Sequence, residues 1–262
     1  MKKHSVLLKE DLCEGCTNCV KNCPTKAIRV HKGKARIIEE LCIDCAQCIR
    51  ICAYHAKYSQ TGSLGDLESY RHPIVLIPPS FYAQFTGVSP NRVRSALYRL
   101  GFQDVVDVAL AAESLSIKTS LFLDENPGIF ISSSCPVVVR LIQIQYPELT
   151  SYLMPFKSPV EAAAEQARQE AVENGIYSDD IGVFFITPCP AKNTSIFDPI
   201  GVKTSFVDET IAASSAYQAI REVLGQEAKS DQDTDFSGFP YSGLSWGQSG
   251  GELKLLQDTI QR

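Results

Sequence analysis

The sequence predicts a small α+β domain followed by a larger α/β domain with a mainly parallel sheet. The first domain is predicted because eight of the ten cysteines are confined to residues 13–52, in two groups of equal spacing. The second is predicted because short apolar runs alternate with helical patterns in the rest of the chain. We expect domains over residues 1–60 and 61–262, joined by a Gly/Ser-rich, charged linker over residues 59–71.

The N-terminal cysteines form an internal repeat. Each copy has the spacing C-x2-C-x2-C-x3-C, and corresponding cysteines are 29 residues apart (42 − 13 = 29). The flanking residues repeat as well, since Glu10-Asp11-Leu12 corresponds to Glu39-Glu40-Leu41. The sequence therefore contains a duplicated module. Its cysteines are Cys13, Cys16, Cys19 and Cys23 in the first copy and Cys42, Cys45, Cys48 and Cys52 in the second.

This spacing is typical of two [4Fe–4S] clusters. Three cysteines at intervals of three residues let a tight loop bind three corners of a cubane cluster, and the fourth ligates the partner cluster. We expect the fourth cysteine of each copy at the start of the following helix. Such crossed ligation keeps two clusters close together, which suits one-electron transfer. The two expected ligand sets are Cys13, Cys16, Cys19 and Cys52, and Cys42, Cys45, Cys48 and Cys23.

Zinc and disulfides are the alternatives for so many cysteines. Zinc sites usually need only two cysteine pairs, and dense cysteine in a reducing compartment indicates metal more often than disulfides. Ala53 replaces the proline that follows Cys23 in the first copy, which removes no ligand. Residues 30–37 predict a hairpin between the two loops. We expect His31 and His55 at the surface rather than as ligands.

Charge and hydropathy exclude several partner classes. The net charge of −5 and scattered basic residues argue against nucleic acid and anionic membranes. No apolar run approaches the ~18 residues of a membrane helix, and the N-terminus lacks the apolar core of a signal peptide. We therefore expect a cytoplasmic protein.

The second domain has recognisable element boundaries. Ser158 is expected as an N-cap with Pro159 at the first helical position, and Gly101 and Gly225 are expected to end helices. The predicted strands cover residues 74–77, 128–132 and 182–186. The predicted helices cover residues 90–100, 136–145, 159–172, 214–224 and 252–261.

The two late cysteines, Cys135 and Cys189, occupy similar positions. Each is expected just beyond the carboxyl end of a strand, where open α/β sheets bind ligands. Each precedes a proline, and at Cys135 this predicts a helix N-terminus, where a thiolate is favoured. Two buried structural cysteines remain the alternative interpretation.

Residues 247–251 match the G-x-S-x-G pattern of α/β-hydrolases. A hydrolase would require a histidine after this serine, but all four histidines lie upstream of residue 73. We therefore expect a flexible loop or a loop that closes over a cofactor.

The order and spacing of several motifs resemble the large subunits of [FeFe]-hydrogenases over essentially the whole chain. Residues 133–136 (Ser-Ser-Cys-Pro) and 146–149 (Tyr-Pro-Glu-Leu) are similar to the first active-site motif. Residues 188–192 (Pro-Cys-Pro-Ala-Lys) are similar to the second, and residues 246–251 to a Gly-rich stretch. The likeness is greatest to a sensory branch with an N-terminal two-cluster ferredoxin. It implies an α+β two-[4Fe–4S] ferredoxin-like domain followed by an α/β hydrogenase-like domain.

The resemblance implies roles for four residues. In this family the H-cluster is a [4Fe–4S] cubane on four cysteines, one of which bridges to a two-iron unit. Cys135 and Cys189 would be two of these ligands, and Lys192 would donate a hydrogen bond to an iron-bound cyanide. Ser134 stands where efficient members have a proton-carrying cysteine. A hydroxyl is a much weaker acid than a thiol, so we expect slow turnover even from an intact site.

The departures from the family pattern limit this expectation. Val139, Val160 and Thr187 replace or adjoin residues that are usually Trp, Gln and Met. The third motif, with the other two H-cluster cysteines, is absent from the 262 residues. Only two of ten cysteines remain after the eight of the repeat, so a third iron–sulfur or H-cluster site would be incomplete. We expect this chain to be the N-terminal part of a longer protein.

The expected function is iron–sulfur electron transfer for redox or hydrogen sensing, without hydrogen turnover by this chain alone. One alternative is an active hydrogenase completed by a missing C-terminal segment or a second polypeptide. Another is a non-redox scaffold in iron–sulfur assembly. The expected partners are an electron-carrier or redox protein and a signalling or hydrogenase partner.

Overall fold

The computed structural model describes residues 4–226 and 242–260. It divides the chain into two compact units, which we describe separately. Unit 1 contains Met1–Thr61, Phe130–Lys157 and Cys189–Ser205, and unit 2 contains Gly62–Ile129, Ser158–Pro188 and Phe206–Arg262. The chain thus passes between the units several times, and the proposed domain boundary at residues 60 and 61 stays a prediction.

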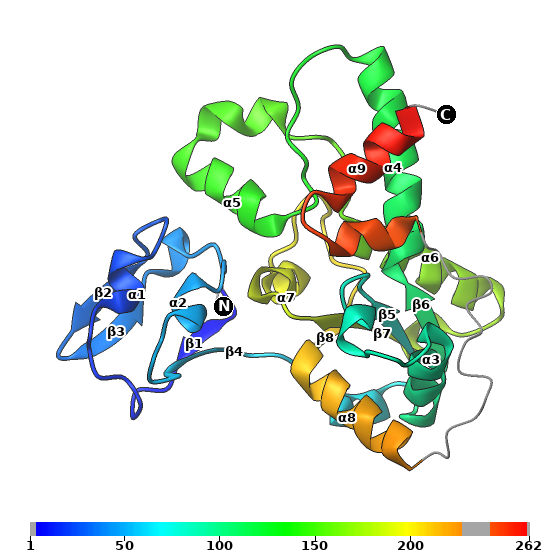
Figure 1. Ribbon diagram of the computed structural model, residues 1–262, viewed down its shortest axis with the longest axis horizontal. Helices are drawn as coiled ribbons and strands as arrows, with labels where there is room; N and C mark the ends of the chain where they lie inside the picture. Colours follow the sequence, from blue (N-terminus) through cyan, green and yellow to red (C-terminus); the bar gives the residue numbers. More distant parts are fainter. Residues whose placement is uncertain (1–3, 227–241, 261–262) are drawn as a thin grey trace. The chain divides into compact units, whose positions relative to one another are not determined.

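The N-terminal part of unit 1 contains two small antiparallel sheets (Figure 1). β1 (Val6–Leu8) pairs with β4 (Lys57–Ser59), and β2 (Ile28–His31) pairs with β3 (Lys34–Ile37). The predicted hairpin is confirmed. Its two-residue turn has φ angles of 48° at Lys32 and 75° at Gly33, as primed hairpin turns require.

The cysteine repeat is also a repeat of backbone conformation. Each copy has one short helix, α1 (Asn18–Lys21) or α2 (Gln47–Arg50). The fourth cysteine of each copy follows this helix instead of starting the next one, so that expectation was wrong. The early end of the helix lets the chain turn back toward the other copy. Positive φ angles recur 29 residues apart, at Gly15 and Asp44, Thr17 and Ala46, and Lys26 and His55.

The later segments of unit 1 form a helical layer. α5 (Pro136–Gln145) contacts both η4 (Pro147–Tyr152) and α7 (Pro190–Phe197). α5 has the predicted bounds. The predicted strand over residues 128–132 is wrong, because only Ile131 forms a single bridge, with Leu153. Ile129 is 80% exposed, so this apolar run is not part of a buried sheet.

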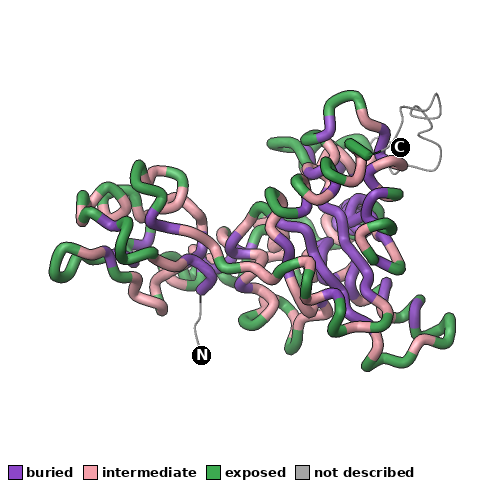
Figure 2. Tube along the Cα trace, turned by 90° about the horizontal axis from the view of Figure 1, so that it is seen from below, coloured by how far each residue is buried: buried purple, intermediate pink, exposed green. Residues whose placement is uncertain are grey.

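Unit 2 is built on a parallel sheet, as predicted, and this sheet has four strands. The strand order is β6 (Asp104–Asp107), β5 (His72–Ile77), β7 (Ile181–Thr187) and β8 (Glu209–Ala212). β5 and β7 are buried along nearly their whole length (Figure 2), which is typical of central parallel strands. β6 and β8 were not predicted, because each has only four residues and begins with an acidic one.

Helices cover this sheet (Figure 1). They are α3 (Pro90–Arg99), α4 (Val108–Glu125), α6 (Pro159–Glu173), α8 (Ala213–Gly225) and α9 (Gly251–Ile260). α3 and α8 contact each other, α6 packs on β5, β6 and β7, and α4 contacts α6 and α9. Ser158 caps α6 by accepting a hydrogen bond from the Glu161 N–H at 3.3 Å, as predicted.

Two details differ from the expectations. The predicted linker over residues 59–71 contains an ordered 3-10 helix, η2 (Leu64–Ser69), which buries Leu67. α4 was not predicted, because serines and threonines interrupt its apolar pattern. Residue 261 of the predicted last helix lies outside the described residues. Within the described ranges, no helix is both long and apolar enough to cross a membrane.

Candidate iron–sulfur centres

The structure brings the eight repeat cysteines together around two cavities. The first cavity is lined by Cys13, Cys16 and Cys19 of the first copy and by Cys52 of the second. The second is lined by Cys42, Cys45 and Cys48 of the second copy and by Cys23 of the first. These are the two sets expected from the spacing, although their role as iron ligands remains a prediction.

The two cavities are also lined by residues at corresponding positions of the repeat. Leu8 in the first corresponds to Ile37 in the second, and Ala56 corresponds to Ala27. Duplication of the sequence has therefore produced two sites with the same backbone plan. The residue types differ at other corresponding positions, among them Gly15 in the first cavity and Asp44 in the second.

Backbone donors point at several of the sulfur atoms. The N–H of Ala27 donates to Cys23 Sγ at 3.2 Å, and the equivalent N–H of Ala56 donates to Cys52 Sγ at 3.4 Å. The N–H of Ala35 donates to Cys13 Sγ, also at 3.4 Å. Such bonds stabilise sulfur that carries negative charge, as cluster-bound thiolates do. The residues present therefore fit a [4Fe–4S] cluster in each cavity.

Burial has the opposite effect on the free thiols. It raises the pKa of Cys42 to about 12, with a further contribution from the Asp44 charge, and the pKa of Cys48 to about 11. Lys57 lowers the pKa of Cys48 in part, but burial dominates. These thiols are protonated at neutral pH until a metal binds, so cluster assembly must release protons here.

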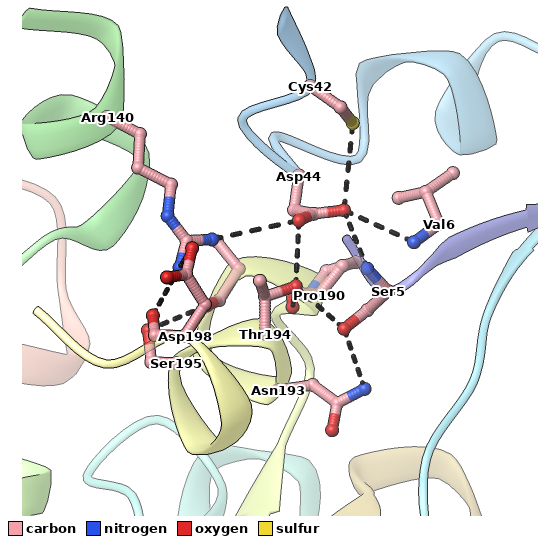
Figure 3. A network of polar contacts seen from close by, with 11 residues as sticks. Ser5, Val6, Cys42, Asp44, Arg140, Pro190, Asn193, Thr194, Ser195 and Asp198 are labelled. Carbon is pink, nitrogen blue, oxygen red and sulfur yellow. Dashed lines mark hydrogen bonds and ion pairs between the residues drawn. The ribbon is translucent and has the colours of Figure 1, made fainter. Parts of the chain in front are cut away.

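A buried polar network lies beside the second cavity (Figure 3). Asp44 Oδ1 accepts hydrogen bonds from the backbone N–H groups of Ser5 at 3.1 Å and Val6 at 3.2 Å. Asp44 Oδ2 accepts one from Thr194 Oγ1 at 2.7 Å and lies 3.8 Å from Arg140 Nη1. Arg140 belongs to α5 and Thr194 to α7, so the network joins the loop of the second cavity to both helices.

Sequence reasoning missed this network. The available signal was that Asp44 occupies the position of Gly15 in the repeat. His4 was missed as well. It is buried, and one of its ring nitrogens groups with Cys42 Sγ and a carboxylate oxygen of Asp44 within 4.8 Å. His31 and His55 are exposed, as expected.

Cys135 and Cys189 are equivalent in one respect only. Each is the N-cap residue of a helix whose first residue is proline, α5 for Cys135 and α7 for Cys189. Cys189 follows β7, as predicted. No strand ends directly before Cys135, so the expected strand at that position was wrong. Cys135 is exposed and Cys189 is half-buried, so they are not two buried structural cysteines. No two of the ten cysteines form a disulfide in this structure.

Ser134 and Lys192 lie close to these cysteines in the sequence. The Ser134 hydroxyl accepts a hydrogen bond from Ser132 Oγ at 3.1 Å. Lys192 is the third residue of α7, and its N–H donates to the carbonyl of Cys189 at 3.2 Å. Their proposed active-site roles stay predictions.

The Gly-rich stretch packs within unit 2. A Cβ at Gly247 would lie 2.8 Å from the Ser80 nitrogen and 3.0 Å from the Pro79 carbonyl carbon, so only glycine allows this approach. Trp246 Nε1 donates to Ser116 Oγ of α4 at 3.0 Å. The stretch therefore covers the loop after β5, at the carboxyl end of the sheet.

The duplicated cysteine cavities and the parallel α/β sheet define an iron–sulfur protein with an attached α/β domain. A family profile described as a 4Fe-4S dicluster domain matches residues 5–53. A second profile, described as the C-terminal domain of the iron only hydrogenase large subunit, matches residues 71–259. The chain belongs to the [FeFe]-hydrogenase large-subunit family.

Individual relatives agree with this assignment. Iron hydrogenase 1 of Clostridium pasteurianum is 27% identical over 204 residues, which cover 70% of this chain and 35% of that protein. The chain thus spans about a third of the length of this curated relative.

Two solved structures have a similar fold. An [FeFe]-hydrogenase structure titled for stepwise H-cluster assembly, HydA(deltaEFG), has a TM-score of 0.55 at 20% identity, covering 75% of this chain and 55% of that one. A variant of [FeFe]-hydrogenase HydA1 from Chlamydomonas reinhardtii has a TM-score of 0.55 at 21% identity, covering 75% and 56%.

Proposed function

We propose that this chain is an electron-transfer protein with two [4Fe–4S] clusters, and that it serves redox or hydrogen sensing. The observation that carries the proposal is the composition of the two cavities. Each contains three cysteines from one copy of the repeat and one from the other. This arrangement supports crossed ligation of two clusters over residues 1–60, ahead of a hydrogenase-like domain over residues 61–262.

Bound clusters of this type would supply reversible one-electron transfer. The residues of the chain hold and shield them. The cysteines provide the thiolate ligands, the N–H groups of Ala27, Ala35 and Ala56 stabilise the sulfur charge, and apolar side chains such as Leu8 and Ile37 limit access of water.

Hydrogen turnover is not part of the proposal for the 262 residues alone. Once eight of the ten cysteines are assigned to two clusters, Cys135 and Cys189 remain, and a conventional H-cluster needs four. The alternative is an active hydrogenase completed by a further segment or polypeptide. It is favoured by the contact between α5 and α7, since the N-cap residue of each helix is one of these cysteines.

We further propose that the chain exchanges electrons with an electron-carrier or redox protein and acts on a signalling or hydrogenase partner in the cytoplasm. The moderate negative charge of −5 supports a protein partner rather than nucleic acid.

The test is iron quantitation and EPR spectroscopy of the anaerobically purified chain. We expect about eight iron atoms per chain, four in each of two cubanes. Cys23→Ala should remove about half of the iron and one of two reduced-state signals. Cys135→Ala is the matched control and should leave both unchanged. A hydrogen–deuterium exchange assay on the same preparation should give no turnover.

Three results would contradict the proposal. Bound zinc with almost no iron would overturn the assignment of both clusters. An unchanged spectrum in Cys23→Ala would overturn crossed ligation. More than eight iron atoms together with hydrogen turnover would favour the alternative.

A further inference from the structure

The two cavities differ at several equivalent positions, and three of these differences involve a charged side chain. One of them is Glu14 of the first cavity, which corresponds to Ile43 of the second. Glu14 is exposed, so solvent screens its charge, whereas the other two charged residues, Asp44 and Lys57, are buried.

The first cavity has Gly15 where the second has Asp44, 29 residues later. The Asp44 side chain is fully buried, and its Oδ1 lies 3.8 Å from Cys42 Sγ. A carboxylate this close to a thiolate ligand opposes any further negative charge on the second cluster.

A second difference concerns a hydrogen bond to sulfur. In the first cavity the N–H of Ala35 donates to Cys13 Sγ at 3.4 Å. The equivalent residue in the repeat is Val6, whose N–H donates to Asp44 Oδ1 at 3.2 Å instead of to Cys42. A hydrogen bond to a cluster sulfur makes reduction of that cluster easier. Because the Val6 N–H is bonded to Asp44 and not to a cysteine sulfur, reduction of the cluster in the second cavity is harder.

A third difference is a buried cation. Lys57 lines the first cavity, where the second has Ile28 at the equivalent position. Lys57 is 4% exposed, and its ammonium group has no hydrogen-bond partner among the described residues. An unpaired ammonium here stabilises an added electron.

Arg140 offsets only part of the Asp44 charge. The same guanidinium pairs with Asp198, with Nη2 at 3.2 Å from Oδ2. The two carboxylates and one guanidinium therefore keep a net negative charge, and Asp44 is the member of this group nearest the second cavity. His4, which also lies beside Asp44, has a carboxylate partner of its own, because its Nε2 lies 3.9 Å from Glu39 Oε1.

We infer that the two clusters have unequal reduction potentials, and that the cluster held by Cys13, Cys16, Cys19 and Cys52 is reduced first. Asp44 lowers the potential of the second cluster, and Lys57 raises that of the first. The inference rests on the proposed presence of two clusters. It adds an order of reduction, because a single electron taken up by the chain would reside on the first cluster. The polar network that joins the loop of the second cavity to α5 and α7 would then lie beside the cluster that is still oxidised.

The test is an EPR-monitored redox titration of the full chain. The wild-type protein should show two separate one-electron steps. Asp44→Asn keeps an acceptor for the N–H groups of Ser5 and Val6 but removes the negative charge. It should therefore raise the midpoint potential of the lower step and leave that of the upper step unchanged. We expect about a tenfold change in the equilibrium for electron exchange between the clusters, which is about 59 mV for one electron. Lys57→Met should lower the midpoint potential of the upper step by at least as much as that of the lower step.

Glu40→Gln and Lys21→Met are the matched controls, because both remove an exposed charge from the same module. Neither should move either step. If Asp44→Asn binds too little iron, Asp44→Gly, which carries the residue of the first copy, takes its place and should shift the same step.

Iron content is measured first, so that the presence of two clusters and the order of their reduction are tested separately. Fewer than eight iron atoms in the wild type would reject the proposed function. With eight iron atoms present, the inference is overturned by coincident steps, by an Asp44 variant that moves only the upper step, or by an unchanged upper step in Lys57→Met.

Discussion

At the scale of single residues, two left-handed glycines of the cysteine module differ in the space that a side chain would have. Gly15 has a φ angle of +66°, and a Cβ there would lie 2.5 Å from the carbonyl oxygen of Gly33. Gly33 has a φ angle of +75° but has no atom within 4 Å of such a Cβ. Asp44, the equivalent of Gly15, accepts the same backbone conformation because its carboxylate is hydrogen-bonded.

This pair of glycines separates backbone strain from steric overlap. Gly33→Ala should destabilise the module by about 1 kcal/mol through the positive φ alone. Gly15→Ala adds the overlap with a backbone carbonyl and should destabilise it by about 3 kcal/mol. The measurement is the urea concentration at which half of the cluster absorption is lost. Equal midpoints for the two variants would mean that the approach of the hairpin to Gly15 is unimportant.

At the scale of elements, β8 begins with a glutamate that is surrounded by other carboxylates. Burial raises the pKa of Glu209, and the charges of Asp66 and Asp208 raise it further, whereas the Thr210 N–H lowers it. The folded state therefore holds this proton more tightly than the unfolded state. As a result, the stability of unit 2 falls as the pH rises above the ordinary value of 4.5.

Glu209→Gln removes this dependence. The variant should be more stable than the wild type at neutral pH, and the difference should vanish below about pH 4.5, where both states of the wild type are protonated. Thermal unfolding at a series of pH values measures it. Glu222→Gln, at an exposed position on α8, is the control. A Glu209 variant that is less stable than the wild type at neutral pH would show that the carboxylate is stabilising there.

At the scale of the whole molecule, the two compact cores have different chemistry. The core of unit 2 is apolar, with Val75, Ile77, Phe184 and Ile186 fully buried. The small core of the cysteine module includes five cysteines, namely Cys13, Cys19, Cys23, Cys48 and Cys52. A core of this size relies on bound metal for much of its stability.

Removal of iron should therefore affect the two cores differently. After treatment with a chelator under reducing conditions, limited proteolysis of the full chain should cut within residues 4–61, while the segments that form β5, β6, β7 and β8 resist. The iron-replete chain is the control and should resist in both regions. Cleavage at equal rates in both regions would contradict independent stabilisation.

The amino-acid sequence by itself determined the chemistry of the cysteine module and the class of the second fold. The 29-residue repeat predicted which cysteines share a cavity, because the spacing of three ligands is a local property and the duplication indicates that the fourth comes from the other copy. Helix bounds such as those of α5 were also predictable, since prolines and capping residues act locally.

Only the tertiary structure decided what depends on distant parts of the chain. The burial of Asp44 requires Thr194 and Arg140, which lie about 100 to 150 positions away. β6 and β8 are strands because they pair with β5 and β7, since four-residue segments have too weak a local preference. The unequal surroundings of the two cavities likewise arise from packing, which no local pattern records.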